Sequence, residues 1–512
     1  MREADYGTVY LVGSGPGDPG LVTVKGLRLI EAADAVVYDR LAPESLLAHA
    51  REDAEFVYVG KRPGDHSMSQ EEINATLVRL GQEGKNVVRL KGGDPYIFGR
   101  GSEEALELLR AGVPFEVVPG VTSGVAAPAY AGIPVTHRGV STSVAFVTGH
   151  EDPTKGRTDV DWKTVAKGAD TLVLYMGVGR LKEISRQIVA AGRPPETPVA
   201  VVRWGTLPEQ RTVTGTLADI ARKVEEAKLG PPAITVVGGV AALREDGLGW
   251  FERRPLFGRR IVVTRARAQA GELSAKLEDL GAEVVEFPTI EIVPPGSFDP
   301  LDAAIRELDS FDWLVFTSVN GVDAFRERLA HHGLDVRAVR RDARLAAIGP
   351  ATAERLRDCG LRVDVVPDEF RAEGLLEAIP AGELEGKRVL IPRAAVAREV
   401  LPEKLREAGA EVVVPPAYRS VPSEAGREAL EKRLRAGEID CVTFTASSTV
   451  ENFVGMFGEG TAELLGGAKV ACIGPITAET ARKHGLTVSV EAGEYTIPGL
   501  VDAVLSLYEA AG

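Results

Sequence analysis

Short apolar runs alternate with amphipathic stretches along almost the whole chain. This alternation predicts stacked strands and helices, which is the α/β class. One helix start is well marked, because Ser69 followed by Glu72 forms a capping box ahead of an apolar-periodic segment. In the first half, strands are expected at Thr8–Val12, Ala35–Tyr38, Glu55–Val59, Asn86–Leu90, Pro114–Val118, Val144–Val147, Thr171–Tyr175, Pro198–Val202, Gln210–Thr214 and Ala233–Val237.

The alternating pattern breaks between Gly238 and Gly258, where glycines and charges follow no clear period. We therefore predict a domain at residues 1–245, a linker at 246–257 and a second domain at 258–512. The second domain contains an internal repeat with a spacing of about 127 residues. The segments beginning at Gly258, Leu314 and Ile348 are echoed from Gly386, Val442 and Ile473. The repeat predicts two similar lobes with a small-molecule cleft between them.

Composition narrows the functional class. The chain has 512 residues, 44% of them apolar, and a net charge of −14, which argues against a general nucleic-acid binder. The N-terminal segment MREADYG is charged and no long apolar run is present, so we expect neither export nor a membrane-spanning helix. Three widely spaced cysteines form no disulfide framework and no metal-ligand pattern, so we expect a reducing, cytoplasmic compartment and no metal.

A glycine-rich loop follows the first predicted strand and reads VGSGPGDPG, Val12–Gly20. Gly13 and Gly15 fit the dinucleotide fingerprint, and Asp39 at the next strand end could mimic its ribose-binding acid. The third glycine position, however, is Asp18, where a carboxylate would occupy the pyrophosphate site. The two prolines of the loop also remove backbone donors. The loop therefore favours a cofactor without phosphates, and S-adenosylmethionine fits better than NAD.

The segment VVRLKGGDPYIFGRGSEE from Val87 joins further motifs in order: GSGPGDPG, VVYDRL, VGKRPGDH, PGVTSGVAAPAYAGIPVTHRG, VTGH and YMG. From about Thr8 to Val240, the chain resembles the uroporphyrinogen-III C-methyltransferases of the tetrapyrrole methylase family. Ser102 departs from the glycine that the family usually has there. The resemblance implies a two-subdomain fold and the following S-adenosylmethionine contacts: Pro16, Gly92, Gly93, Asp94, Ile97, Thr122, Ser123, Met176 and Gly205. Taken alone, each of these residues would more often be part of a turn or a core.

The same resemblance implies that Asp39 accepts a proton and Lys61 donates one during methyl transfer to a ring carbon. A carboxylate suits the removal of a proton from the pyrrole system as the carbon attacks. The alternative is that Asp39 caps the next helix and Lys61 is solvated. Substrate carboxylates are expected to meet one or more of the basic residues Arg62, His66, Arg100 and Arg138.

The second half resembles uroporphyrinogen-III synthase through IVVTRA, FTSVNGV, IPRA, AYRS, FTAS and IGPITAE. The resemblance implies a duplicated, bilobed α/β fold whose lobes are joined by two strands, expected at Phe287–Val293 and Pro416–Val421. One lobe would comprise residues 258–290 with 422–512, and the other residues 294–416.

A synthase of this kind must hold a flexible octacarboxylate substrate in a folded conformation. This task requires positioning of the substrate more than a strong acid or base. Tyr418 is the expected proton donor to the leaving hydroxyl. Expected substrate contacts are Thr264, Arg265, Ser318, Asn320, Arg393, Thr445, Ser447 and Thr477. For each of these alone, turn formation or capping is the commoner role.

Together the halves imply an enzyme that cyclises hydroxymethylbilane to uroporphyrinogen III and methylates it twice to precorrin-2, for sirohaem or cobalamin. Its partners would be tetrapyrroles, with a homodimer through the methyltransferase half left open. Two alternatives remain from the sequence. The methyltransferase half could act on another corrinoid or a protein, and the duplicated half could be a ligand sensor without catalysis.

Overall fold

The computed structural model describes residues 6–60, 68–149, 160–265, 267–367, 372–380, 382–397, 399–423 and 426–509. The chain divides into two compact units. One contains the residues up to Arg260 with Lys276–Val284 and Tyr508 onward, and the other contains Ile261–Ala275 and Val285–Leu507. No helix within the described ranges is both long and apolar enough to cross a membrane. The α/β class expected from the sequence is confirmed.

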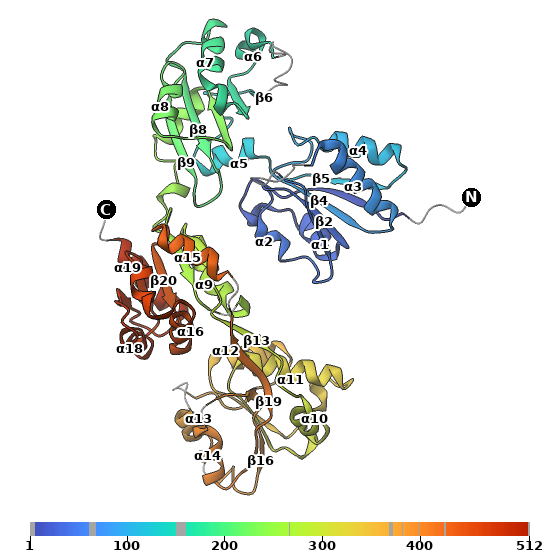
Figure 1. Cartoon of the computed structure of the whole chain (residues 1–512), viewed down its shortest axis with the longest axis vertical. Helices are drawn as coiled ribbons and strands as arrows, with labels where there is room; N and C mark the ends of the chain where they lie inside the picture. Colours follow the sequence, from blue (N-terminus) through green and yellow to red (C-terminus); the bar gives the residue numbers. More distant parts are fainter. Residues whose placement is uncertain are drawn as a thin grey trace, which may run out of the picture. The chain divides into compact units, whose positions relative to one another are not determined.

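The first unit begins with a five-stranded parallel sheet in the order β3-β2-β4-β1-β5. Its strands are β1 (Val9–Gly13), β2 (Ala35–Tyr38), β3 (Glu55–Tyr58), β4 (Val87–Lys91) and β5 (Phe115–Val118). Its helices are α1 (Val24–Ala32), α2 (Glu44–Leu47), α3 (Gln70–Gln82) and α4 (Gly101–Arg110). Helices α3 and α4 lie on one side of the sheet and α1 and α2 on the other (Figure 1). Because both faces are covered, β1 and β2 are buried almost along their whole length and do not alternate apolar with polar residues.

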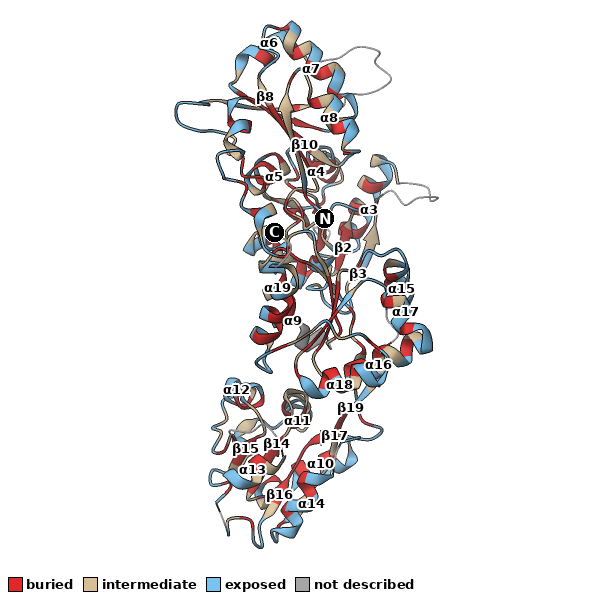
Figure 2. Cartoon of the chain, turned by 90° about the vertical axis from the view of Figure 1, so that its left-hand side faces the viewer, coloured by how far each residue is buried: buried red, intermediate tan, exposed pale blue. Residues whose placement is uncertain are grey.

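The second part of this unit contains a mixed sheet in the order β6-β7-β10-β8-β9. Its strands are β6 (Val144–Thr148), β7 (Thr171–Tyr175), β8 (Pro198–Arg203), β9 (Arg211–Thr216) and β10 (Ala233–Val237). Its helices are α5 (Ser123–Tyr130), α6 (Trp162–Gly168), α7 (Leu181–Ala190) and α8 (Ile220–Glu226). The strands are mostly buried and the outer helix faces exposed (Figure 2). In both sheets of this unit, every strand forms within one or two residues of its predicted range.

The segment predicted as a linker packs onto the first unit instead of running free. Phe251 is buried, and the Trp250 indole N–H donates to the carbonyl of Ala129 at 3.1 Å. The Glu252 carboxylate accepts hydrogen bonds from Gln210 (2.9 Å) and Thr212 (2.5 Å). Its short 3₁₀ turn, Phe251–Arg253, has neither the helix nor the strand period, so periodicity could not reveal it.

The second half contains two further sheets and a connecting ladder. One of these sheets has the order β12-β11-β20-β21-β22. Its strands are β11 (Arg260–Val263), β12 (Glu283–Glu286), β20 (Cys441–Phe444), β21 (Lys469–Cys472) and β22 (Val490–Glu491). Its helices are α9 (Arg267–Asp279), α15 (Arg427–Arg435), α16 (Ser447–Phe457), α17 (Thr461–Leu465), α18 (Pro475–Lys483) and α19 (Ile497–Glu509).

The other sheet is parallel, in the order β15-β14-β16-β18. Its strands are β14 (Trp313–Phe316), β15 (Arg344–Ala347), β16 (Arg388–Leu390) and β18 (Glu411–Val413). Its helices are α10 (Asp299–Arg306), α11 (Val319–His331), α12 (Pro350–Asp358), α13 (Ala372–Ala378) and α14 (Val400–Glu407). A ladder of β13 (Ile290–Val293), β19 (Pro416–Pro422) and β17 (Arg393–Ala394) connects the parts, with β13 and β19 antiparallel. The two connecting strands therefore lie in the segments where the sequence placed them.

Candidate functional site

Three loops meet where β1, β4 and β5 end. The Ser14 N–H donates to the Lys91 carbonyl at 2.8 Å, and Gly15 and Gly93 exchange backbone hydrogen bonds of 3.3 and 2.6 Å. A Cβ on Gly120 would overlap the carbonyl oxygen of Gly93, so the backbones touch where only glycine fits. The carboxyl edge of a parallel sheet is the usual binding edge of such folds.

The Val12–Gly20 loop has almost no free backbone donors. Between residues 14 and 20, the N–H groups of Ser14, Gly15, Asp18 and Gly20 all have acceptors, and within the described residues only that of Gly17 has none. Phosphate binding at such a loop needs several free N–H groups. The loop is therefore unsuited to a pyrophosphate, as its sequence predicts.

The carboxylate of Asp18 is held inside the unit. It accepts hydrogen bonds from the Gly20 N–H at 2.8 Å and the Tyr130 hydroxyl at 2.6 Å. Burial and the neighbouring carboxylate raise the pKa of Tyr130 well above its ordinary value, so the phenol stays a donor. Because Tyr130 belongs to α5, the glycine loop is tied to the second part of the unit.

The GGDP loop presents one acid and several apolar side chains. Asp94 accepts the Tyr96 N–H at 2.8 Å and the Gly120 N–H at 3.1 Å, which leaves each carboxylate oxygen a further lone pair. Tyr96, Ile97 and Phe98 are exposed although apolar. The ring of Phe98 lies 4.8 Å from that of Tyr175 on β7. These side chains offer an apolar surface beside a hydrogen-bonding carboxylate.

The predicted contacts from the second part of the unit lie beside these loops. Thr122 shares a 2.6 Å hydrogen bond with the Tyr175 hydroxyl, which also accepts the Gly124 N–H at 2.8 Å. Met176 follows directly and is 51% exposed. The loop around Gly205 contacts the Val12–Gly20 loop, because the Thr206 hydroxyl accepts the Asp18 N–H at 3.0 Å. A Cβ on Gly205 itself would overlap Ala127 of α5.

Backbone strain gathers at the same loops. Among the described residues, six that are not glycine have a positive φ. Five of them lie in these loops: Phe98, Arg100, Met176, Trp204 and Thr206. A positive φ at a non-glycine residue costs free energy. It persists only where the surrounding structure enforces it, typically at functional sites. The distribution marks this edge independently of any motif.

Asp39 directly follows β2. Its Oδ1 accepts the Leu41 N–H at 3.0 Å and its Oδ2 accepts from Arg89 at 3.1 Å. The residue does not cap α2, whose N-cap is Pro43. The predicted donor Lys61 lies outside the described residues, as do Arg62 and His66. Of the other basic residues, Arg100 is exposed and pairs with Glu103, and Arg138 is exposed.

Sequence reasoning missed the charged residues beneath this edge. Arg89 and Lys91 lie two residues apart on the same face of the buried strand β4. Both donate hydrogen bonds to Glu104 of α4. The signal was present, because two cations two residues apart in a central apolar strand require a buried acid. Tyr130 and Tyr175, which join the loops, carried no sequence signal beyond their type.

In the second half, one group of predicted residues lies around β17, β19 and α11. Ser318 is the N-cap of α11, accepts the Gly321 N–H at 3.1 Å and shares a 3.0 Å hydrogen bond with the Tyr418 hydroxyl. Tyr418 and Arg393 are buried, and Arg393 forms an ion pair with Glu399. Asn320 is half-buried on the first turn of α11.

The other group lies around β11, α16 and α18. Thr264 is buried and its hydroxyl donates to the Thr443 carbonyl at 2.7 Å, which is a structural role. Burial lowers the pKa of the Arg265 guanidinium. Ser447 begins α16 and accepts from Thr480 of α18 at 2.9 Å. The remaining two are the half-buried Thr445 and the buried Thr477.

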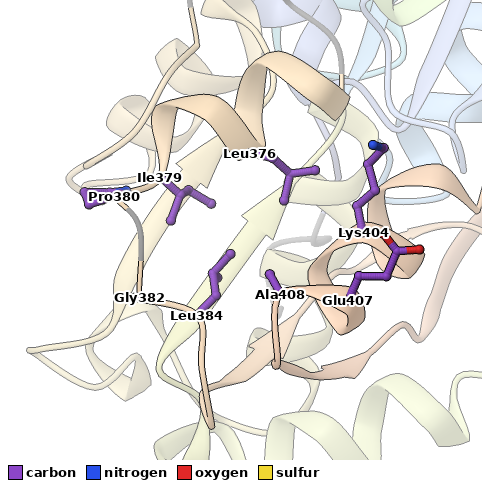
Figure 3. Close-up of a pocket in the computed structure, with 8 residues that line it drawn as sticks. All are labelled: Leu376, Ile379, Pro380, Gly382, Leu384, Lys404, Glu407 and Ala408. Carbon is purple, nitrogen blue, oxygen red and sulfur yellow. The ribbon is translucent and has the colours of Figure 1, made fainter.

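A depression of about 310 Å³ lies between α13 and α14, lined by Leu376, Lys404 and Glu407 among others (Figure 3). None of the predicted site residues lines it. Across the described part of the chain, no cluster of histidine, cysteine and acidic residues could hold a metal ion. The candidate site residues therefore lie in two regions. One is the loop edge of the first unit, where the loops after β1, β4 and β5 meet, and the other comprises the two groups of polar residues in the second half.

Comparisons with known proteins agree with this division. Residues 8–221 match the family described as Tetrapyrrole (Corrin/Porphyrin) Methylases, and residues 271–502 match Uroporphyrinogen-III synthase HemD. Porphyrin biosynthesis protein HemD from Ruminiclostridium josui is 38% identical over 98% of both chains. The S-adenosyl-L-methionine-dependent uroporphyrinogen III methyltransferase from Methanosarcina barkeri is 54% identical over 47% of this chain and 94% of its own.

Among solved structures, Uroporphyrin-III C-methyl transferase from Thermus thermophilus complexed with S-adenyl homocysteine is 44% identical. The match covers 46% of this chain and all of that one, with a TM-score of 0.41. The match to the Ruminiclostridium josui protein spans both of the regions that the family models find in this chain. The chain therefore belongs to the HemD family of porphyrin biosynthesis proteins, with a tetrapyrrole methylase region followed by a uroporphyrinogen-III synthase region.

Proposed function

We propose that this chain carries out two consecutive steps of tetrapyrrole biosynthesis. The synthase half cyclises hydroxymethylbilane to uroporphyrinogen III, and the methyltransferase half methylates that product twice to give precorrin-2. The observation that carries the proposal is the presence of both family regions on one chain. The family that matches the second region is named for the synthesis of uroporphyrinogen III. Relatives of the first region are named for the methylation of the same compound.

The loop edge of the first unit would hold S-adenosylmethionine, which supplies an electrophilic methyl group. The residues present fit this molecule, because the glycine loop has almost no donors for phosphate while the GGDP loop offers a carboxylate beside exposed apolar side chains. Asp94 would accept from a ribose hydroxyl or the amine. The remaining contacts would be Pro16, Gly92, Gly93, Ile97, Thr122, Ser123, Met176 and Gly205.

Asp39 would accept the proton that leaves the pyrrole system of the substrate during methylation. Its two fixed hydrogen bonds leave one lone pair on each oxygen for this task. A general base must lie within hydrogen-bond reach of the proton it removes. Lys61 would donate a proton on the same substrate.

The synthase half would work through positioning. Cyclisation forms a carbon–carbon bond, expels water and inverts the last ring, so the protein must hold one folded arrangement of a flexible polyanion. Tyr418, hydrogen-bonded to Ser318, would protonate the leaving hydroxyl. The polar residues Arg265, Asn320, Arg393, Thr445, Ser447 and Thr477 would contact the substrate.

The compartment and assembly belong to the same proposal. All three cysteines are free thiols, and Cys441 and Cys472 are buried, which suits a reducing cytoplasm. A homodimer through the methyltransferase half is the proposed assembly.

The test supplies the full chain with hydroxymethylbilane, with and without S-adenosylmethionine, and identifies products by absorbance and mass. Without the methyl donor, uroporphyrinogen III should accumulate; with it, precorrin-2 should replace the unmethylated product. Because hydroxymethylbilane closes slowly on its own to the type I isomer, the isomer must be determined. Formation of type I alone would contradict the synthase assignment, and absence of methylation of supplied uroporphyrinogen III would contradict the methyltransferase assignment.

A further inference from the structure

Beneath the loop edge of the first unit lies a cluster of buried charges. The side chains of Arg89 and Lys91 on β4 are only 4% and 6% exposed, and that of Glu104 on α4 is fully buried. Lys, Arg and Glu are seldom fully buried in proteins unless they are paired. The fourth member is Asp39, whose side chain is 27% exposed and is the part of the cluster that reaches the surface.

The guanidinium of Arg89 sits at the centre of this cluster. Its Nε donates to Glu104 Oε1 at 3.2 Å and its Nη2 donates to Asp39 Oδ2 at 3.1 Å. Its Nη1 donates to the carbonyls of Leu90 (3.0 Å) and Val37 (3.5 Å). Four of its five N–H donors are therefore used, which fixes the orientation of the planar group.

Glu104 is the anchor of the cluster. Its Oε1 also accepts from Lys91 at 2.7 Å and from Gln70 at 3.4 Å, whereas its Oε2 has no hydrogen-bond partner among the described residues. Burial, followed by the charge of Arg89, lowers the pKa of Lys91. Two cations and two carboxylates balance the cluster, but such buried pairs often add little stability over apolar residues of similar size. A structural account alone leaves their presence under a catalytic edge unexplained.

We propose that Arg89 is a positioning residue for methyl transfer. Anchored on Glu104, it holds the carboxylate of Asp39 in the orientation from which that group accepts the substrate proton. The proposal rests on the assignment of Asp39 as proton acceptor under the proposed function. Positioning matters here because a displacement of about 1 Å can cost on the order of 10²-fold in rate.

The test uses the full chain with supplied uroporphyrinogen III and S-adenosylmethionine in a double-mutant cycle. Arg89→Met should lower kcat for methylation by roughly 10²-fold and leave the KM for S-adenosylmethionine within about twofold. In an Asp39→Asn background, the same change should add less than about twofold, because there is no base left to orient. Equal losses in both backgrounds would overturn the positioning role of Arg89.

Two further variants separate positioning from charge and from folding. Arg89→Lys keeps the charge but not the fork of donors, so kcat should stay low; full recovery would overturn the geometric argument. Arg89→Met combined with Glu104→Gln removes one charge of each sign and should keep a cooperative thermal transition with the same loss of kcat. Wild-type kcat in that folded double variant would overturn the proposal.

A matched control variant tests whether the loss is specific to Arg89, and two further outcomes test the proposed function independently of Arg89. Arg79 pairs with Glu83 on the exposed face of α3, and Arg79→Met should change neither kcat nor KM. If Asp39→Asn alone methylated at the wild-type rate, the base assignment would fail whatever Arg89 does. If wild type did not methylate at all, the proposed function would fail before the cycle begins.

Discussion

The two halves of the chain hold their candidate polar groups in different ways. In the first half, five strained non-glycine residues and a buried charge cluster surround one sheet edge. In the described part of residues 261–507, no non-glycine residue has a positive φ, and most of the predicted polar residues lie at helix starts or strand ends. The first half places one partly exposed carboxylate, that of Asp39, over buried charged partners, and the second half presents a set of hydrogen-bonding positions.

The reactions explain the difference. Methyl transfer requires a proton acceptor at a fixed position, and fixing a short carboxylate beside a loop takes strain and buried partners. Ring closure requires a folded substrate, which many weak contacts can supply. The first kind of site should therefore fail abruptly when one group is changed, and the second should fail gradually.

The largest expected effect is that of Asp39→Asn. This change keeps the shape of the side chain and the hydrogen bond from Leu41 but removes the proposed base. Methylation of uroporphyrinogen III should fall by at least about 10²-fold, measured in single turnover, while ring closure of hydroxymethylbilane stays near wild type. Loss of ring closure in a folded variant would show that the two sites are coupled, and the contrast between the halves would no longer hold.

A smaller effect is expected for Asp94→Ala, measured as the Kd for S-adenosylhomocysteine by calorimetry. The lost acceptor should weaken binding by about 1.5–3 kcal/mol, the usual worth of a hydrogen bond to a charged group. Asp94→Asn is the matched control, because it retains one acceptor for the N–H groups of Tyr96 or Gly120 and should lose less. An unchanged Kd in folded Asp94→Ala would remove this residue from the cofactor site.

Sequence patterns predicted the strands of the first half closely because the central strands, such as β1, β7 and β10, are mostly apolar and buried. A strand such as β7 is an uninterrupted apolar run after its first residue, and amphipathic helices separate many of the strands. The capping box at Ser69 also formed, with the Glu72 N–H donating to Ser69 at 3.2 Å and the Ser69 N–H donating to Glu72 at 2.6 Å. Local rules of this kind need no knowledge of distant residues.

The features that sequence could not predict depend on residues far apart in the chain. Tyr130 meets Asp18 across 112 positions, and Arg89 meets Asp39 across 50. Trp250 and Phe251 read as part of an aperiodic linker, yet they pack on Tyr130 with ring centroids 5.0 and 4.9 Å away. The identities of these side chains were visible, but their partners are set by tertiary packing. The roles assigned to individual site residues remain predictions.

In the synthase half, Tyr418→Phe should have a mild effect. Phenylalanine keeps the buried ring and loses only the hydroxyl that contacts Ser318. Ring closure should slow by about tenfold or less, below the roughly 10²-fold expected for loss of a dedicated acid, and methylation of supplied uroporphyrinogen III should not change. A loss of about 10²-fold or more, measured by formation of the type III isomer, would make this half as dependent on one group as the first.

The smallest expected effect concerns stability and pH in the synthase half. Hydrogen bonds from Arg328, which is 2.8 and 2.6 Å away, lower the pKa of the buried Asp302 to about 2. Since the folded pKa lies below the usual value of about 4, this carboxylate stabilises the fold above pH 4, and its contribution is lost as pH falls towards 2.

Asp302→Asn should therefore lower the Tm by a few degrees at pH 7, and the difference from wild type should shrink as the pH is lowered from 5 to 3, followed by calorimetry. Asp335 is the matched control, because Arg337 also lowers its pKa to about 2, but both side chains are exposed. Solvent screens such a pair, so Asp335→Asn should leave the Tm almost unchanged at every pH. Equal effects of the two substitutions would mean that burial does not decide which charges stabilise this half. In that case its polar groups could not be ranked by burial as those around Asp39 are.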